Sequence, residues 1–383
     1  RAFALERLIG SGDAEAVRRA HLQWVVEFCR RASEDFEGPD PLPRVEQCRH
    51  LLADLRTALD FALATDSIPE ATAIVGSLGW FWVWDGLGSE MRDTFDVVRE
   101  HLTRAEPADR LAFGFADVWT TAHASGDPAG MDLALQGWAA TAEDLGNARH
   151  TAVALVIRGS HQCFSDPEGS RLVLQDAFER CGAVGESYWE TYAECGLAFC
   201  WIMLERIDQA RPLLDHMEAR ARRLGNPQLV ADALSRRAVI DYTAGRYAEI
   251  EATCRELEGE FAQLTHVNVT AAPRSMLMSA EAVRGRGLVH EAAARELLGA
   301  YLRSGEIQHV PLIIGALADI LIATDRAAGA EPMLAELAGL VEPYPYFRVR
   351  TRHRRALVAM ALDDRATARE LLFCVSQKAI QKY

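Results

Sequence analysis

The fold is decided by a stretch in which two apolar runs flank a short polar turn: residues 197–214 read LAFCWIMLERIDQARPLL. The same order returns at residues 238–257, which read AVIDYTAGRYAEIEATCREL. Apolar residues recur at helical spacing on both sides of each turn, so each stretch predicts two helices packed together. The residues expected at these contacts are Leu197, Ala198, Trp201, Ile207, Ala210 and Leu214, then Ala238, Gly245, Tyr247, Ile250 and Leu257.

Helix-breaking turns recur about every 40 residues along the chain. They begin at Ser125, Ser165, Glu205, Ala244, Gly285, Thr324 and Asp363. A second marker lies out of phase with them, because the tripeptide LGN at residues 145–147 returns at residues 224–226. One helical hairpin cannot bury its apolar face alone, so successive hairpins stack into a solenoid. We therefore expect an all-α fold: a right-handed α-solenoid of tetratricopeptide-like hairpins with a period of about 40 residues.

Composition excludes several classes of function. The 383 residues carry a net charge of −14, which argues against direct binding of this segment to nucleic acid, since phosphate contacts need a basic face. No apolar run reaches the roughly 20 residues of a membrane span, and no signal peptide opens the chain. The eight cysteines show no CxxC pairing, which favours reduced, mostly buried thiols and a cytoplasmic location.

Lysine is almost absent from the chain. Lys378 and Lys382 are its two lysines, so residues 1–377 contain no Gly-Lys-Ser/Thr phosphate-binding loop and no Schiff-base lysine. We expect no cofactor, no catalytic residue and no metal ligand set in this segment. The histidines include no pair spaced three or four apart for zinc, and no acid/base pair stands out among many surface carboxylates.

The part of the chain before the regular repeats is also expected to be helical. The densest cluster of helix breakers, at residues 37–43, predicts a loop. Apolar periodicity predicts helices at residues 2–9, 14–33, 44–64, 69–85, 89–104 and 107–124. Trp80, Trp82 and Trp84 alternate within one of them; core packing is the favoured interpretation, and ligand stacking is the alternative.

Four stretches in this part resemble the helical region of bacterial LuxR-type or STAND ATPase transcriptional regulators. Residues 1–8 (RAFALERL) and 12–21 (GDAEAVRRAH) are similar to the family's R-x-Y/F-A-x-E-R-L and G-E-A-x-x-V-R-R-x-H run. Residues 52–63 (LADLRTALDFAL) and 78–86 (LGWFWVWDG) are similar to its D-N-L-R-A-A-L-x-W-A-L and L-x-x-F-W-x-x-R-G helices. The sequence departs from the family pattern at Ala53, Asp54 and Asp85.

This resemblance implies a domain organisation. Residues 1–10 would end a winged-helix module, 11–105 would form a helical entry region, 106–372 the solenoid, and 373–383 a tail. In such regulators the helical region senses an inducer or partner, while ATP binds a separate module. The chain is expected to be a fragment, with ATP implied for the parent protein and DNA contacted only through another domain.

The tail carries both lysines. Residues 375–383 (VSQKAIQKY) resemble the start of a LuxR-type recognition helix, and a final solenoid helix is the alternative. The resemblance implies nucleic-acid contacts from Ser376, Lys378, Gln381 and Lys382. A basic cluster at residues 348–355 predicts either a solvated helix start or a docking patch for nucleic acid or for an acidic surface of another domain.

The inner face of a solenoid is its usual binding surface. The tetratricopeptide register places eight ligand-binding candidates on that face: Tyr192, Cys195, Phe199, Asp232, Ser235, Tyr242, Met276 and Asp319. This mostly apolar set with a few polar groups is typical of small-molecule pockets. It predicts a small, partly apolar effector or an amphipathic helix, and the alternative is an empty groove.

The expected function is therefore ligand or partner sensing by the solenoid of a STAND-type regulator. The expected partners are a small-molecule effector, a partner protein or a second copy of the chain, with no membrane. Two other classes stay open. One is an α/α-toroid enzyme such as a glycosidase, which needs carboxylates and aromatics on loops at one end. The other is a plain protein-interaction adaptor.

Overall fold

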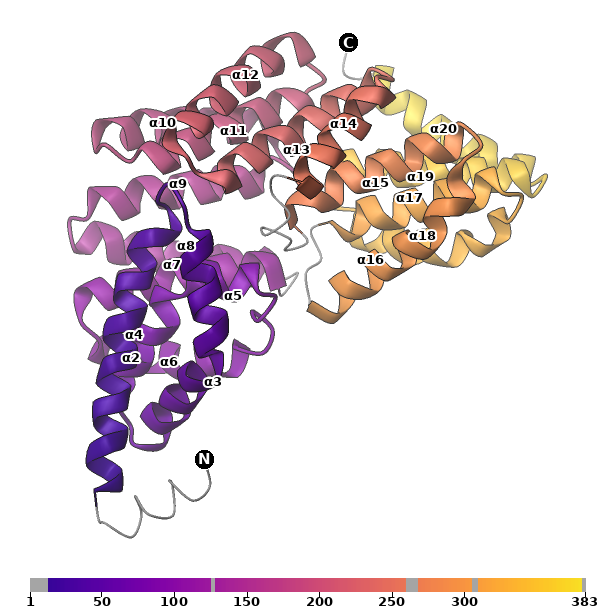
Figure 1. The fold of residues 1–383 in the computed structure, drawn as a ribbon. Coiled ribbons are helices and arrows are strands. Elements are labelled where there is room, and N and C mark those ends of the chain that lie inside the picture. The colour runs from indigo at the N-terminus through magenta and orange to yellow at the C-terminus, as the bar shows by residue number, and fades with distance from the viewer. Residues whose placement is uncertain (1–12, 125–127, 260–267, 305–308, 381–383) are drawn as a thin grey trace. The chain divides into compact units, whose positions relative to one another are not determined.

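The computed structural model describes residues 13–124, 128–259, 268–304 and 309–380 (Figure 1). Within these ranges every regular element is a helix and none is a strand, which confirms the all-α class. Backbone contacts divide the chain into two compact units, residues 1–154 and 155–383, and helix α9 (Ala148–Gln162) crosses from one to the other. The boundary expected at residue 105 rests on the family resemblance and stays a prediction. The expectations for residues 1–10 and for the turn at Ser125 lie outside the described residues.

The first unit consists of helices separated by short turns. They are α2 (Ala14–Phe36), α3 (Leu42–Ala64), α4 (Ile68–Ser77), α5 (Gly79–Trp84), α6 (Arg92–Glu100), the 3-10 turn η1 (Leu102–Arg104), α7 (Pro107–Ala124), α8 (Pro128–Asp144) and the start of α9. Helix α4 contacts α2, α3, α6 and α7, so it lies at the centre of this unit.

Two glycines let α7 approach α4 and α5 backbone to backbone. A Cβ at Gly76 would lie 2.5 Å from the backbone nitrogen of Phe113, and one at Gly79 would lie 2.8 Å from Cα of Ala116. Only glycine leaves room for this packing, because real Cβ atoms do not come so close to a backbone. The predicted helix 69–85 is accordingly two helices, which break at Leu78. The predicted helix 89–104 is likewise shorter and ends in η1.

The second unit is a succession of helical hairpins. Its helices after α9 are α10 (Pro167–Ala183), α11 (Ser187–Met203), α12 (Ile207–Leu224), α13 (Pro227–Thr243), α14 (Tyr247–Gly259), α15 (Asn268–Val283), η3 (Gly287–His290), α16 (Glu291–Ser304), α17 (Val310–Ala323), η4 (Ala327–Gly329), α18 (Glu331–Leu340), α19 (Pro345–Ala361) and α20 (Arg365–Ile380).

Left-handed backbone positions mark the turns of this unit at the predicted rhythm. Within the hairpins they are Glu205, Gly245, Gly285, Asp325 and Asp363, with φ between 56° and 76°. Between hairpins the out-of-phase LGN marker places Gly146 and Gly225 in the same conformation, and Gly185 falls between them. A left-handed residue ends an α-helix and reverses the chain, which explains why the repeat could be read from turn residues.

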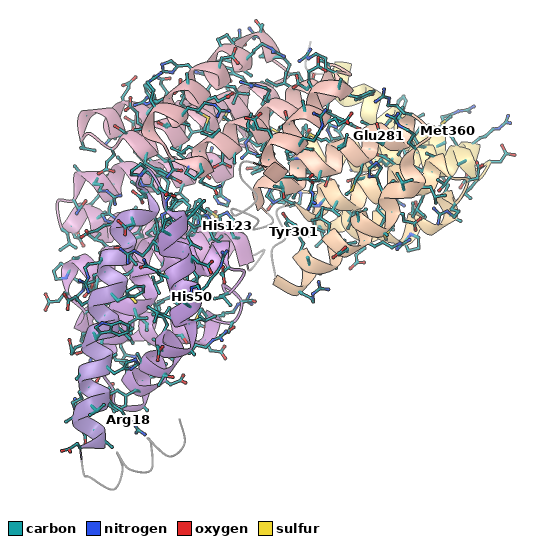
Figure 2. The ribbon with its side chains drawn as sticks, in the orientation of Figure 1. Arg18, His50, His123, Glu281, Tyr301 and Met360 are labelled. Atoms are coloured by element: carbon teal, nitrogen blue, oxygen red, sulfur yellow. The ribbon has the colours of Figure 1, made fainter. Side chains whose placement is uncertain are left out.

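The odd-numbered helices of this unit form one continuous row. Helix α13 contacts α11 and α15, and α17 contacts α15 and α19, while each even-numbered helix packs beside its sequence neighbours. We call this row, α11–α13–α15–α17–α19, the inner row. Tyr301 of α16, labelled in Figure 2, is fully buried in an apolar cluster with Leu297 and Ile313.

A larger core cluster joins α15 to α19. It includes Leu317, Leu321 and Leu334, and Phe164, from the turn that follows α9, packs against it. The Phe164 ring stacks on Phe347 of α19 at 5.8 Å between centroids. The first and last hairpins of the second unit are therefore in direct contact.

Candidate functional site

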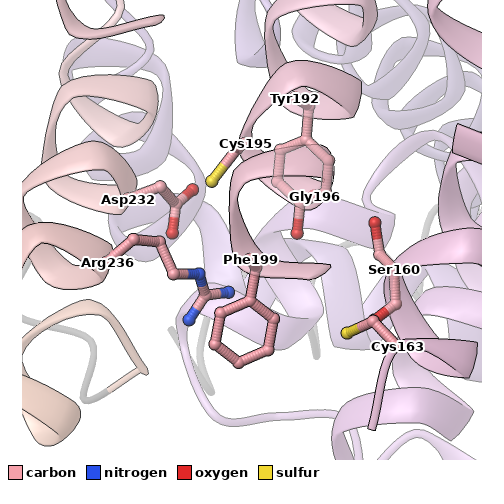
Figure 3. A pocket seen from close by; sticks show the side chains of 8 residues that line it. All are labelled: Ser160, Cys163, Tyr192, Cys195, Gly196, Phe199, Asp232 and Arg236. Atoms are coloured by element: carbon pink, nitrogen blue, oxygen red, sulfur yellow. The ribbon is translucent and has the colours of Figure 1, made fainter. Parts of the chain in front are cut away.

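The structure brings half of the predicted ligand-binding residues into one pocket on the inner row. Tyr192, Cys195 and Phe199 reach it from α11, and Asp232 reaches it from α13 (Figure 3). These positions recur on one face of each helix, which is the spacing that places side chains on a common surface. The pocket has an empty volume of about 290 Å³, which includes space open to solvent. The enclosed part of this space is about 20 Å³, room for roughly one water, so a small organic ligand requires the lining side chains to move apart.

Four further residues complete the pocket wall, and none of them was predicted from the sequence. They are Ser160, Cys163, Gly196 and Arg236. Arg236 lies one helical turn after Asp232 and therefore on the same face of α13. The repeat register that predicted Asp232 could have predicted Arg236 as well. Ser160 and Cys163 come from α9 and the turn that follows it, before the two repeats that set the register. No comparable signal in the sequence identified those two.

Asp232 is a carboxylate in a poorly hydrated position. Burial raises its pKa to about 6, although the Arg236 charge and a 3.3 Å hydrogen bond donated by Gln228 both favour the ionised form. Burial also raises the pKa of Tyr192 above its usual range, and the nearby Asp232 charge adds to this. Asp232 therefore titrates close to neutral pH.

The Arg236 guanidinium stacks on an aromatic ring of the pocket. Its central carbon lies 4.3 Å from the centroid of Phe199. Burial raises the pKa of Cys195 to about 12, and the neighbouring Arg236 acts in the opposite direction. An arginine stacked in this way is held in one plane, with the donors at its edge left available.

Two polar atoms of the pocket wall are shielded from solvent without a hydrogen bond. Among the residues that the structure describes, neither Nε of Arg236 nor Oγ of Ser160 has a hydrogen-bond partner. Figure 3 shows the two side chains on opposite sides of the pocket. Unsatisfied buried polar atoms cost free energy, and a bound ligand or ordered water commonly accounts for them.

The other predicted residues lie elsewhere. Asp319 of α17 accepts two hydrogen bonds from Arg354 of α19, at 2.9 and 2.8 Å, and its charge acts on Tyr242. Ser235 and Met276 are buried, with 3 % and 5 % of their surface exposed, and neither lines the pocket. The inner row thus carries a pocket around Asp232 and Arg236 and a closed ion pair between Asp319 and Arg354.

The basic cluster at residues 348–355 is largely engaged in ion pairs. Arg348 and Arg352 pair with Glu342, and Arg355 pairs with Glu331. Arg350 stacks on Tyr346 at 4.4 Å. Most of these positive charges are therefore neutralised by Glu342 in the turn before α19 and by Glu331 at the start of α18, which leaves little of the expected docking patch.

The tryptophans at 80, 82 and 84 are core residues. Trp80 contacts Trp84 and Trp119, at 5.2 and 4.6 Å between centroids, and Nε1 of Trp82 donates to the carbonyl of Val75. Their exposed fractions are 7 % or less, so the favoured core-packing interpretation is confirmed.

The tail residues carry no structural argument for nucleic-acid binding. Helix α20 runs without a break through the predicted boundary at residue 373. The side chains of Ser376 and Lys378 and all of Gln381 and Lys382 lie outside the described part of the chain. Their role stays a prediction.

Further observations concern the expected metal, membrane and cysteine properties. Within the described ranges, no three His, Cys, Asp or Glu side chains gather in a way that could hold a metal ion. None of the described helices combines the length and apolar character needed to cross a membrane. The seven cysteines whose side chains are described are buried, and none of these seven forms a disulfide.

Family models and curated proteins were compared with this chain. No protein-family model matches the chain, and no curated protein matches it. The resemblance to STAND regulators therefore rests on the sequence motifs alone.

Proposed function

We propose that this chain is the ligand-sensing solenoid of a STAND-type transcriptional regulator, and that it binds its effector in the pocket of the inner row. The observation that carries the proposal is the composition of that pocket. Residues of α9, α11 and α13, from three successive hairpins, line one small space with both apolar and charged groups. Pockets that bind small molecules have this combination.

A pocket shared by three hairpins suits a sensor. A ligand that contacts all three favours one arrangement of the hairpins over others, provided that its affinity for the arrangements differs. The attached ATPase and DNA-binding modules, which the family resemblance implies, would respond to that arrangement. The chain itself would perform no catalysis.

A thermal-shift screen with recovery of the compound tests this function. The purified chain is heated with neutral sugars, amines, carboxylic acids and amino acids, and each compound is afterwards analysed by mass spectrometry. A sensor gains thermal stability from one class and returns the compound unchanged, because ligand bound to the native state stabilises it. Consumption of a sugar would instead support the toroid enzyme, and no stabilisation by any class would support the adaptor.

A matched pair of variants locates the binding. Phe199→Leu should abolish the stabilisation, because Phe199 lines the pocket. The same change at Phe373, a ring of α20 that is 60 % exposed, should leave it intact. The regulator assignment is tested by the reading frame that encodes this chain: it should also encode a phosphate-binding loop, and a frame without one contradicts the assignment.

A further inference from the structure

Asp232 and Arg236 have the spacing of a helical ion pair but do not form one. Among the described residues, six other ion pairs have an acid four residues before an arginine. Four are closed at 2.8–3.0 Å (Glu15–Arg19, Asp176–Arg180, Glu218–Arg222 and Glu291–Arg295), and two lie at 3.8 Å (Glu27–Arg31 and Glu251–Arg255). This geometry normally brings the two groups together. In the described structure, Arg236 makes no ion pair with any carboxylate, Asp232 included.

Local contacts hold the two groups apart. The Arg236 guanidinium is drawn to the Phe199 ring, 4.3 Å away, and Gln228 donates a hydrogen bond to the Asp232 carboxylate from the preceding turn. Both side chains line the pocket. The wall therefore presents one positive and one negative group side by side. Gln228 is hydrogen-bonded to Asp232 and Cys195 to Arg236, and the remaining polar atoms of both groups face the pocket.

The remainder of the lining is apolar or weakly polar. Phe199 and Tyr192 contribute aromatic rings to the pocket. The Phe199 ring also contacts the Phe164 ring, with 5.4 Å between the two centroids. Arginine has only donors, and its planar edge matches the two oxygens of a carboxylate. A carboxylate accepts hydrogen bonds, so Asp232 complements an ammonium group.

We propose that this pocket binds a small zwitterion of the α-amino-acid class, with its carboxylate on Arg236, its ammonium group on Asp232 and an apolar side chain against Phe199 and Tyr192. The Ser160 hydroxyl on the opposite wall is a further polar contact. This inference rests on the proposed sensing function and names the ligand class for the same pocket.

The pocket favours an amino acid over a simple acid or amine because its two charges balance. A plain carboxylate would bring a second negative charge next to Asp232, and a plain amine would bring a second positive charge next to Arg236. Each like-charge approach is unfavourable in a poorly hydrated site. Because the enclosed space is small, the ligand needs a compact side chain, and leucine serves as the apolar probe.

Isothermal titration with three probes tests the proposal. L-Leucine has both charged groups, 4-methylpentanoate lacks the ammonium group, and 3-methylbutylamine lacks the carboxylate. We expect leucine to bind roughly tenfold or more tighter than either analogue, since each lost group removes a charge-assisted hydrogen bond. Either analogue binding as tightly as leucine would overturn the proposal.

Two substitutions assign the contacts. Arg236→Met should reduce leucine affinity to the level of 3-methylbutylamine, and Asp232→Asn should reduce it to the level of 4-methylpentanoate. The matched controls are Arg180→Met and Asp176→Asn, which change a closed pair on α10 with the same spacing and should leave leucine binding unaltered. Circular dichroism spectra and melting temperatures verify that each variant is folded.

The result separates the two proposals. If leucine and both analogues fail to bind while another compound class stabilises the chain, the amino-acid proposal is wrong and the sensing function stands. If leucine binds but the Arg236 and Asp232 variants bind it equally well, the assigned contacts are wrong. If no compound class binds, both proposals fall.

Discussion

The inner row contains two Asp–Arg sites that behave differently. Asp319 and Arg354 come from neighbouring helices and form a closed pair, with side-chain exposures of 14 % and 15 %. Asp232 and Arg236 come from one helix and stay apart on a pocket wall. Gly315 accounts for part of the contrast, because a Cβ at that position would lie 2.9 Å from the central guanidinium carbon of Arg354. Aspartate and arginine thus form a closed pair at Asp319 and Arg354, where Gly315 leaves room for the guanidinium. They stay unpaired at Asp232 and Arg236, where the Phe199 ring holds the guanidinium.

The largest expected effect is the loss of the closed pair. Arg354→Met leaves Asp319 buried without its partner, so the free energy of unfolding should fall by about 3–5 kcal/mol. Arg236→Met removes no closed ion pair, only the more distant charge that favours ionised Asp232, so the free energy of unfolding should fall by clearly less than for Arg354→Met. Urea unfolding followed by circular dichroism measures both, and equal losses would contradict the contrast between the two sites.

A double variant identifies the origin of that loss. Asp319→Leu combined with Arg354→Met replaces both charges by apolar groups, which is often nearly neutral for a buried pair. Most of the stability should therefore return. A double variant as unstable as Arg354→Met alone would show that packing, and not the uncompensated charge, caused the loss.

The next effect concerns the room that Gly315 provides. Gly315→Ala places a methyl group against the Arg354 guanidinium, which is held in place by Asp319, and should cost about 1–3 kcal/mol. Gly339→Ala in α18 is the matched control, because nothing lies within 4 Å of a Cβ there. The control should gain up to about 1 kcal/mol from helix propensity. Stabilisation of both variants would exclude the proposed role of Gly315.

The pH dependence of stability distinguishes the open site. The pKa of Asp232 is about 6 in the folded chain, above its ordinary value of 3.8, so ionisation is harder in the fold than in the unfolded chain. Below pH 3.8, Asp232 is neutral in both the folded and the unfolded chain, so its ionisation does not reduce stability. Between pH 3.8 and about 6 the unfolded chain ionises more readily than the folded chain, so the free energy of unfolding falls as the pH rises. Asp232→Asn should therefore exceed the parent chain in stability by up to about 3 kcal/mol at pH 7.5, which is the equivalent of the pKa shift, with about 2–4 °C in melting temperature for each kcal/mol, and the difference should be smallest at pH 4.

Other groups around Asp232 contribute to this titration. They are Arg236 and Gln228 on α13, and Tyr192 and Cys195 on α11. Tyr192 and Cys195 stay neutral over this pH range, because burial raises the pKa of each. Melting curves at pH 4, 5, 6 and 7.5 are the measurement, and a stability difference independent of pH would refute the assignment.

The smallest effect should come from Gln228. Gln228→Leu removes the hydrogen bond that favours the ionised carboxylate, so the pKa of Asp232 should rise further. The free energy of unfolding at pH 7.5 should fall by less than about 1 kcal/mol. The pH at which the stability difference from the Gln228→Leu/Asp232→Asn double variant levels off should move upwards, and a downward shift would be inconsistent with the proposed role.

The repeat was readable in the sequence because its turns need special backbone positions. Gly245, Gly285 and Asp325 are left-handed, and few residue types adopt that conformation. The break at Leu78 was not readable, because it depends on how closely α7 approaches Gly76 and Gly79. Helical periodicity predicts which residues of a helix are buried, but it does not predict which helix packs against them.

The site was predictable only where the register applied. Tyr192, Cys195, Phe199 and Asp232 share the pocket because they occupy equivalent positions on successive helices. Asp319 occupies the equivalent position in its repeat, but it does not line the pocket. It is paired instead with Arg354, which lies 35 residues later in the chain. Arg354 belonged to a basic cluster that suggested a solvated surface, and a count of charges cannot show which arginine is paired.

The stacking of Phe164 on Phe347 has a consequence for how the second unit unfolds. In an open array each hairpin is supported only by its neighbours, so the ends can fray one hairpin at a time. Here the last hairpin also rests on the first, because Phe164 packs into the cluster that contains Phe347. Separating α19 from that cluster exposes an aromatic ring at the opposite end of the array. The two ends are therefore expected to lose their structure together, as one cooperative transition.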